Sequence, residues 1–121
     1  MAAYVKVEVP AELKERSLAV LEKARKGGKI RIGSNEVTKA IERQKAKLVV
    51  VAEDVSPPEV VMHLPQLCKE KNVACGFVAT RKALGEKAGI GVPTAAVAIV
   101  EEGDAKKDVE DLAKKLMKLG A

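Results

Sequence analysis

The apolar positions of this chain repeat with two different periods, and the change of period predicts where strands and helices lie. Short runs of β-branched and small residues at 48–52 and 95–100 are typical of strands buried on both faces of a sheet. Further strands are predicted at 29–32 and at 73–79, the latter interrupted by Gly76. Between the strands, apolar residues recur every three or four positions, as on an amphipathic helix. The first predicted helix has Pro10 in its first turn. The others span 34 to about 44, follow Ser56, span 81–88 and follow Asp104.

Residues that favour helix ends flank these segments. Gly27-Gly28 and Gly89 are suited to ending helices. Side chains that accept a hydrogen bond at a helix start predict four N-caps. These are Ser34, Ser56, Thr80 and Asp104. In the helix after Ser56, Pro65 removes one backbone hydrogen bond, so a kink or restart is expected near His63. Its predicted core face consists of Val60, Val61, Leu64, Leu67 and Cys68.

Helices and strands therefore alternate from the first helix to the last. This order predicts an α/β fold, a three-layer α/β/α sandwich with helices on both faces of a four-stranded, mostly buried sheet. The length of 121 residues suits a single domain, 1–121. Residues 4–9 alternate and are short, and they fit either a lead-in or an edge segment.

The charge balance favours a polyanionic partner, with solubility alone as the alternative explanation. The formal net charge is +5 and the pI is about 9.2. Tyr4 and Phe77 are the only aromatic residues, which argues against RNA modules that stack bases on aromatic rings. Nucleic acid would have to be bound by hydrogen bonds, phosphate contacts and aliphatic side chains.

Several classes of site are not indicated by the sequence. Cys68 and Cys75 fall on a helix and a strand and are expected to be buried and reduced. We expect no metal site, because His63 is the only histidine. No cofactor motif is found, so no cofactor is expected. Without a signal peptide or an apolar run of membrane-spanning length, the protein is expected to be cytosolic.

The stretch 33–43 is predicted to form a helix with two different faces. Val37, Ala40 and Ile41 form an apolar stripe. The polar face carries an amide, a carboxylate and two cations, on Asn35, Glu36, Lys39 and Arg43. This face suits a ligand that has both base edges and phosphates, although a solvated surface helix explains it equally well.

The loop at 90–93 carries two aliphatic side chains, Ile90 and Val92, between glycines. Exposed aliphatics in a loop indicate an apolar platform for an unpaired base or a protein partner. The alternative is that both side chains point into the core.

These segments resemble a known family. The stretch 33–43 (GSNEVTKAIER) resembles the signature of the kink-turn-binding ribosomal proteins, and so do 46–55, 63–68 and 84–89. The resemblance covers residues 4 to about 118 and is strongest to archaeal members of the large ribosomal subunit. It implies an α/β/α sandwich that binds an RNA kink-turn, a bent helix–bulge–helix with sheared G·A pairs. It also implies binding to ribosomal RNA, to the guide RNAs of box C/D and H/ACA ribonucleoproteins beside their core proteins, and to RNase P RNA. The free protein would be a monomer.

The resemblance also implies roles for individual residues. Asn35 and Glu36 would read the guanines of the sheared pairs, and Lys39 would contact the same base edges. Gly33 and Ser34 would approach the RNA with backbone and hydroxyl. Ile90, Val92 and Pro93 would cover the flipped-out bulge nucleotide. Arg43 would contact the RNA backbone, and Arg81 would lie near a phosphate. Lys29 and Arg31 are expected to share an exposed face, and with Lys39, Arg43 and Arg81 they would neutralise phosphates. Two positions depart from the family pattern: Ile32 replaces a frequent lysine, and Gly91 lacks a side chain often found there.

Two hypotheses from other classes remain. One is a small α/β enzyme with Glu53, Asp54 and His63 at a strand-end pocket, where α/β active sites gather. The simpler interpretation is that Glu53 and Asp54 neutralise a basic residue such as Lys39. The other hypothesis is a protein-interaction scaffold that uses the last helix and the 90–92 loop. No nucleophile accompanies His63, so the sequence favours a protein that is not an enzyme.

Overall fold

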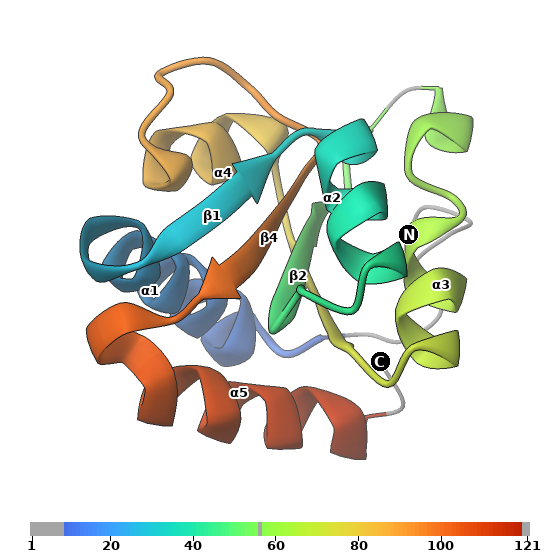
Figure 1. The fold of residues 1–121 in the computed structure, drawn as a ribbon. Helices are drawn as coiled ribbons and strands as arrows, with labels where there is room; N and C mark the ends of the chain where they lie inside the picture. The colour runs from blue at the N-terminus through green and yellow to red at the C-terminus, as the bar shows by residue number, and fades with distance from the viewer. Residues whose placement is uncertain (1–8, 56, 120–121) are drawn as a thin grey trace.

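The structure, a computed structural model, describes residues 9–55 and 57–119. Within them, helices and strands alternate in the predicted order (Figure 1). The helices are α1 (Ala11–Gly27), α2 (Ser34–Glu42), α3 (Leu64–Glu70), α4 (Arg81–Ala88) and α5 (Lys106–Lys118). The strands are β1 (Lys29–Ile32), β2 (Leu48–Ala52), β3 (Ala74–Val78) and β4 (Ala96–Glu101). The 3-10 turns η1 (Pro58–Val60) and η2 (Gly103–Ala105) precede α3 and α5. All but the last residue of the predicted lead-in at 4–9 lies outside the described residues.

The four strands form one mixed sheet in the order β1-β4-β2-β3. β2 and β3 are parallel, whereas β4 is antiparallel to both β1 and β2. The carboxyl ends of β1, β2 and β3 therefore lie at the same edge as the amino end of β4. We call this the upper edge, marked by residues 33, 53, 79 and 95, and the opposite one the lower edge, marked by residues 28, 47, 73 and 102 (Figure 1).

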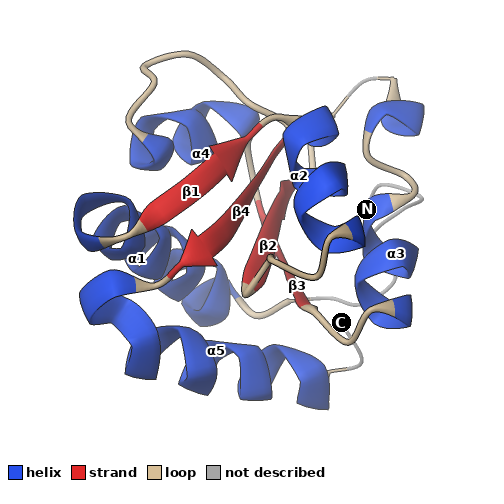
Figure 2. Ribbon diagram, in the orientation of Figure 1, coloured by secondary structure: helices blue, strands red, loops and turns tan. Residues whose placement is uncertain are grey.

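Helices cover both faces of the sheet, with α1, α4 and α5 on one and α2 and α3 on the other (Figure 2). This confirms the predicted α/β/α sandwich. Every residue of β2 and β3 is buried, as expected for strands covered on both sides. Gly76 lies within β3 and does not interrupt it. A Cβ at this position would lie 3.1 Å from Leu116 Cδ1 and 3.3 Å from Ser17 Oγ, so glycine makes room for α5 and α1.

Two of the predicted N-caps are wrong. Gly33 occupies the cap position of α2, and the Ser34 hydroxyl donates elsewhere, to the carbonyl of Val60. Asp104 lies in η2, and α5 begins after it without a side-chain cap. Thr80 does cap α4, since its Oγ1 accepts from the Ala83 N–H at 3.1 Å. The predicted cap at Ser56 lies outside the described residues.

The segment before α3 explains the predicted restart. A 3-10 turn at η1 is followed by α3 from Leu64, so the restart near His63 is confirmed, and Pro65 lies in the first turn of α3. There the missing N–H has no intrahelical partner to lose. Val61, Leu64 and Cys68 are buried as predicted, but Val60 is 41% exposed, and its assignment to the core is wrong.

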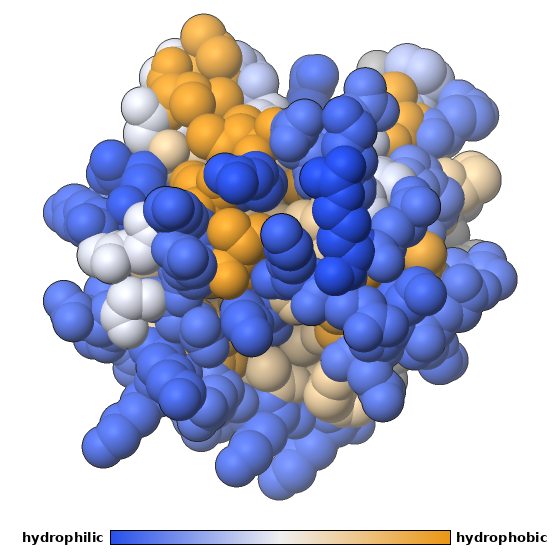
Figure 3. Space-filling view, viewed as in Figure 1, coloured by the Kyte–Doolittle hydropathy of each residue, from blue (hydrophilic) through white to orange (hydrophobic). Residues whose placement is uncertain are grey.

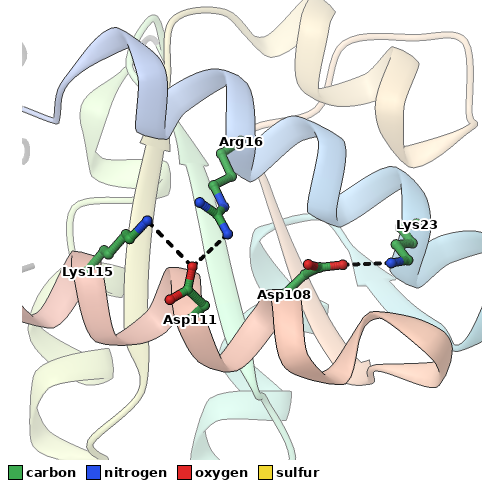
Figure 4. A network of polar contacts seen from close by, with 5 residues as sticks. All are labelled: Arg16, Lys23, Asp108, Asp111 and Lys115. Atoms are coloured by element: carbon green, nitrogen blue, oxygen red, sulfur yellow. Dashed lines mark hydrogen bonds and ion pairs between the residues drawn. The ribbon is translucent and has the colours of Figure 1, made fainter.

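α5 packs against the sheet through a buried apolar stripe and against α1 through ion pairs at the rim (Figure 4). Asp111 accepts from Arg16 Nη2 at 2.6 Å and lies 3.5 Å from Lys115 Nζ. Lys23 donates to Asp108 at 2.7 Å, and this hydrogen bond, with the charge of Lys23, lowers the pKa of the Asp108 carboxyl. These pairs are largely solvent-exposed, so the buried stripe should dominate the stability of α5.

Two neighbouring residues of α5 test this division. Leu112→Ala should lower the free energy of unfolding by about 2–5 kcal/mol, because it leaves a cavity at a fully buried position. Asp111→Asn should cost less than about 1 kcal/mol, as is usual for exposed ion pairs. Urea unfolding followed by circular dichroism measures both values. Equal losses would mean that the ion pairs, not the apolar stripe, hold α5 in place.

Candidate nucleic-acid interface

The upper edge of the sheet collects most of the predicted contact residues. α2 starts directly after β1, and the loop at 90–93 leads into β4, which pairs with β1. The Gly33 N–H donates to the Ala96 carbonyl at 2.9 Å, and the Thr94 N–H donates to the Arg81 carbonyl at 3.2 Å. The sheet therefore brings together the start of α2, the start of α4 and the 90–93 loop.

The first turn of α2 presents the predicted base-reading side chains to solvent. Val37, Ala40 and Ile41 are buried, so Asn35 and Glu36 are turned outward. Lys39 Nζ lies 3.6 Å from Glu36 Oε1, one turn along the same face. Gly33 has φ 99°, and a Cβ there would meet nothing within 4 Å. Glycine is therefore favoured at this position by its left-handed backbone and not by lack of space.

A chain of hydrogen bonds fixes this turn to the segment before α3. The Ser34 hydroxyl donates to the Val60 carbonyl at 2.6 Å. The Thr38 hydroxyl donates to the Ser34 carbonyl at 2.8 Å, and His63 Nε2 lies 2.8 Å from Thr38 Oγ1. Because the Thr38 hydrogen is already used, His63 Nε2 must be the donor in the last contact. Thr38 and His63 thus orient α2, a role that sequence reasoning missed because they meet only in the fold.

A hollow of about 700 Å³ opens beside these groups. It is lined by Ile32, Gly33, Ser34, Asn35, Glu36, Glu59, Val60 and His63. The predicted readers Asn35 and Glu36 therefore share a concave surface with Glu59 and Val60 of η1. The sequence pattern assigns Val60 to the core. Ile32 contributes an aliphatic wall here, at the position where a lysine would add charge.

The 90–93 loop is exposed, as one of the two sequence interpretations required. Ile90 is 39% and Val92 58% exposed. Figure 3 shows hydrophobic atoms gathered on the part of the surface where this loop follows α4, next to strongly hydrophilic groups. Gly91 has φ 71°, and a Cβ at this position would meet nothing within 4 Å, so its glycine serves the turn.

The loop is held close to α4 by a second glycine. A Cβ at Gly85 would lie 1.8 Å from the Val92 carbonyl oxygen, closer than any real contact. The Gly85 carbonyl also accepts from the Ile90 N–H at 3.2 Å. Gly85 thus sets the position of the two aliphatic side chains. A glycine in the middle of a predicted helix was the available signal.

The predicted cations are spread more widely than the base readers. Arg81 lies at the upper edge, where its backbone N–H donates to Asp54 Oδ1 at 2.8 Å and its Nε lies 3.7 Å from the same atom. Arg31 is exposed on β1. Lys29, at the lower edge, lies 3.9 Å from Glu101, and Arg43 follows the far end of α2. The structure therefore does not place Lys29 and Arg43 beside Asn35.

The groups of the enzyme hypothesis have separate partners. Glu53 accepts from Lys14 Nζ at 2.6 Å, Asp54 binds Arg81, and His63 binds Thr38. The simpler interpretation, that Glu53 and Asp54 neutralise basic residues, is confirmed, with Lys14 and Arg81 as the partners. The suggested partner Lys39 is wrong, because Lys39 pairs with Glu36. The scaffold hypothesis needs an apolar face of α5 for a partner. The apolar stripe of α5 is instead buried against the rest of the fold.

Metal ligands and thiols are the other groups that the sequence analysis considered. No group of three or more His, Cys, Asp or Glu residues in this part of the chain is arranged to hold a metal ion. Cys68 and Cys75 are buried free thiols, as predicted. The hydrogen bond with Cys68 and burial raise the pKa of the Cys75 thiol. No helix in the described ranges is long and apolar enough to cross a bilayer.

Comparisons with known proteins cover the same region. Residues 15–109 match the sequence model of the ribosomal protein L7Ae/L30e/S12e/Gadd45 family. Among solved structures, the Giardia lamblia 15.5kD RNA binding protein is similar at a TM-score of 0.90 and 29% sequence identity. That match covers 98% of this chain and 99% of the other. Both comparisons include α2, α4 and the 90–93 loop.

Adding one methyl group at Gly85 tests the close approach of the Val92 backbone to α4. Gly85→Ala should lower the free energy of unfolding by about 1–3 kcal/mol, because the loop backbone must move away from α4. Glu86→Ala, at the next and exposed position, is the matched control and should stay within about 0.5 kcal/mol of wild type. Thermal unfolding measures both. A wild-type stability for Gly85→Ala would show that the loop is not held by this contact.

Proposed function

Because the chain belongs to the ribosomal protein L7Ae/L30e/S12e/Gadd45 family, we propose that it is an RNA-binding structural protein that recognises kink-turn motifs. The observation that carries the proposal is the first turn of α2, which holds Asn35 and Glu36 outward beside a hollow. The similarity to an RNA-binding protein over nearly the whole of both chains supports it. The net charge of +5 favours the same class of partner.

Asn35 and Glu36 are the proposed readers of the sheared G·A pairs. Guanine presents N1–H and N2–H donors when it is not in a Watson–Crick pair, and a carboxylate accepts both. The amide of Asn35 both donates and accepts, so it can contact a base edge of either kind. Lys39, 3.6 Å from Glu36, would keep the carboxylate oriented and contact the same edges. Gly33 and Ser34 leave the backbone open to close approach.

The 90–93 loop is the proposed cover for the bulged nucleotide. Ile90, Val92 and Pro93 offer an aliphatic surface at the upper edge, close to the start of α4. An unstacked base can be buried against such a surface without an aromatic partner. Arg81 would neutralise a phosphate beside it, and Arg31, Arg43 and Lys29 would act further along the RNA. Base contacts would give specificity and phosphate contacts affinity.

Binding would stabilise the bent form of the RNA at the expense of extended forms. A protein with this effect can nucleate assembly of larger particles. We therefore propose ribosomal RNA and the box C/D and H/ACA guide RNAs as targets, with RNase P RNA as a further one and guide-ribonucleoprotein core proteins as neighbours. These targets follow from the resemblance to archaeal members of the family. We propose further that the free protein is a monomer in the cytoplasm. Catalysis has no part in it.

A titration with two RNAs tests the proposed recognition. One RNA carries a kink-turn with its sheared G·A pairs, and the other has these pairs replaced by Watson–Crick pairs. Fluorescence energy transfer between labels on the two stems measures bending. The first RNA should bend at protein concentrations at least about tenfold lower than the second, because the second lacks the base edges that Asn35 and Glu36 would contact. If the two RNAs bent at equal midpoint protein concentrations, the proposal would be wrong.

Glu36→Ala should weaken binding to the intact motif by about 1–3 kcal/mol, because the guanine donors lose their acceptor. Glu42→Ala removes the same charge from the other end of α2 and is the matched control, expected to bind at least as tightly as wild type. Gel-shift titrations at fixed salt measure both. If the two variants bound alike, Glu36 would have no role in reading guanine.

A further inference from the structure

Several cations of this protein form ion pairs, whereas other exposed ones, including Lys106 and Lys107 on α5, form none within the described residues. At the lower edge of the sheet, unpaired cations come together from two segments. On the side of α1, α4 and α5, cations meet carboxylates in ion pairs that include Lys14–Glu53, Lys23–Asp108 and Lys87–Glu22. A group of exposed cations at the lower edge has no ion pair within the described residues. We call this group the basic edge. It consists of Arg43, Lys45 and Lys47 after α2, and Lys69 and Lys71 at the end of α3.

The two loops of the basic edge lie side by side because they lead into adjacent strands. Leu48 and Ala74 are partners in the parallel pairing of β2 with β3, and the loops immediately precede them. In Figure 1 the first loop runs below α2 to the start of β2, and the second runs below α3 toward β3. The cations therefore form one surface drawn from two segments that are distant in sequence.

Both loops have a defined backbone. Gln44 at φ 58° and Asn72 at φ 59° are the two described non-glycine residues with positive φ, and each follows the end of a helix. The Lys47 N–H donates to the Ile99 carbonyl at 2.7 Å, and the Val73 N–H donates to the Cys68 carbonyl at 2.8 Å. The cations are thus presented by ordered turns and not by loose chain.

The like charges of the basic edge repel one another and so do not stabilise the fold. Glu42 and Glu70 are the carboxylates closest in sequence to the basic edge, and both line the hollow between α2 and α3. A protein partner is disfavoured, because lysine is depleted at protein interfaces, where aromatic residues and methionine are enriched. Clustered lysines without exposed apolar neighbours are what a phosphate backbone requires.

The basic edge also continues from the proposed RNA site. α2 has nine residues and is about 13 Å long, so Arg43 begins the basic edge about that distance from Asn35. We propose that the basic edge is a second phosphate-binding surface, which receives the backbone of a duplex stem that extends from the motif held at the start of α2. This inference rests on the proposed function and adds to it a preference for RNA with a long stem.

The test compares two variants with equal loss of charge. The first replaces the lysines of the basic edge by glutamine (K45Q/K47Q/K69Q/K71Q). The control replaces four exposed α5 lysines that lack ion pairs within the described residues (K106Q/K107Q/K114Q/K118Q). Each is titrated with a kink-turn RNA whose stems are either cut close to the G·A pairs or lengthened by about one helical turn. Circular dichroism establishes that both variants are folded.

On the long-stem RNA, the basic-edge variant should lose about tenfold or more in affinity near 0.15 M salt, and its slope of log K against log salt should fall by about two or more. The control should stay within about threefold of wild type on the same RNA, since its lysines lie away from the stem. On the short-stem RNA, both variants should bind like wild type.

Equal losses for the two variants would show an effect of net charge alone and overturn the inference. So would a loss by the basic-edge variant that is the same on short and long stems. Failure of the proposed function has a different outcome, because wild type would then not distinguish the short-stem RNA from its Watson–Crick counterpart.

Discussion

The antiparallel pairing of β4 between β1 and β2 brings the 90–93 loop to the edge of the sheet where α2 and α4 begin. At the upper edge, the Gly33 N–H donates to Ala96 and the Ala52 N–H donates to Ala95, both at 2.9 Å. These bonds fix the start of β4 beside the ends of β1 and β2. A parallel β4 would begin at the lower edge and carry the 90–93 loop away from Asn35 and Glu36. The sheet thereby unites two segments that are more than fifty residues apart in the chain.

Most of the fold could be predicted because it follows from local periodicity. The run at 48–52 is apolar at every position, which is typical of a strand covered on both faces, and β2 is fully buried. The errors occur where a local rule competes with a tertiary partner. Local propensity favours Ser34 as the cap of its own helix, but its hydroxyl instead donates a hydrogen bond to the Val60 carbonyl of η1. Val60 fits a helical stripe in sequence, yet η1 turns it outward.

The candidate site was predictable to the extent that it lies on one helix. The spacing of Val37, Ala40 and Ile41 is enough to turn Asn35, Glu36 and Lys39 outward. The resemblance to a family supplied the loop as the second half of the site. No periodicity could predict that Glu59 and Glu36 line the same hollow or that Thr38 contacts His63, because each pair joins α2 to a segment some 25 residues later. The role of Gly85 was hidden for the same reason.

The scarcity of aromatic residues gives these rigid contacts their importance. A stacked base can slide over a ring with little loss, whereas a hydrogen bond to a base edge weakens steeply when its angle departs from linearity. A protein with one tyrosine and one phenylalanine must therefore hold its polar side chains in fixed positions. Here small residues do this: Ser34 and Thr38 fix α2 by hydrogen bonds, and Gly85 lets the Val92 backbone rest on α4. Specificity for RNA would then depend as much on these small residues as on the charged groups that touch the bases.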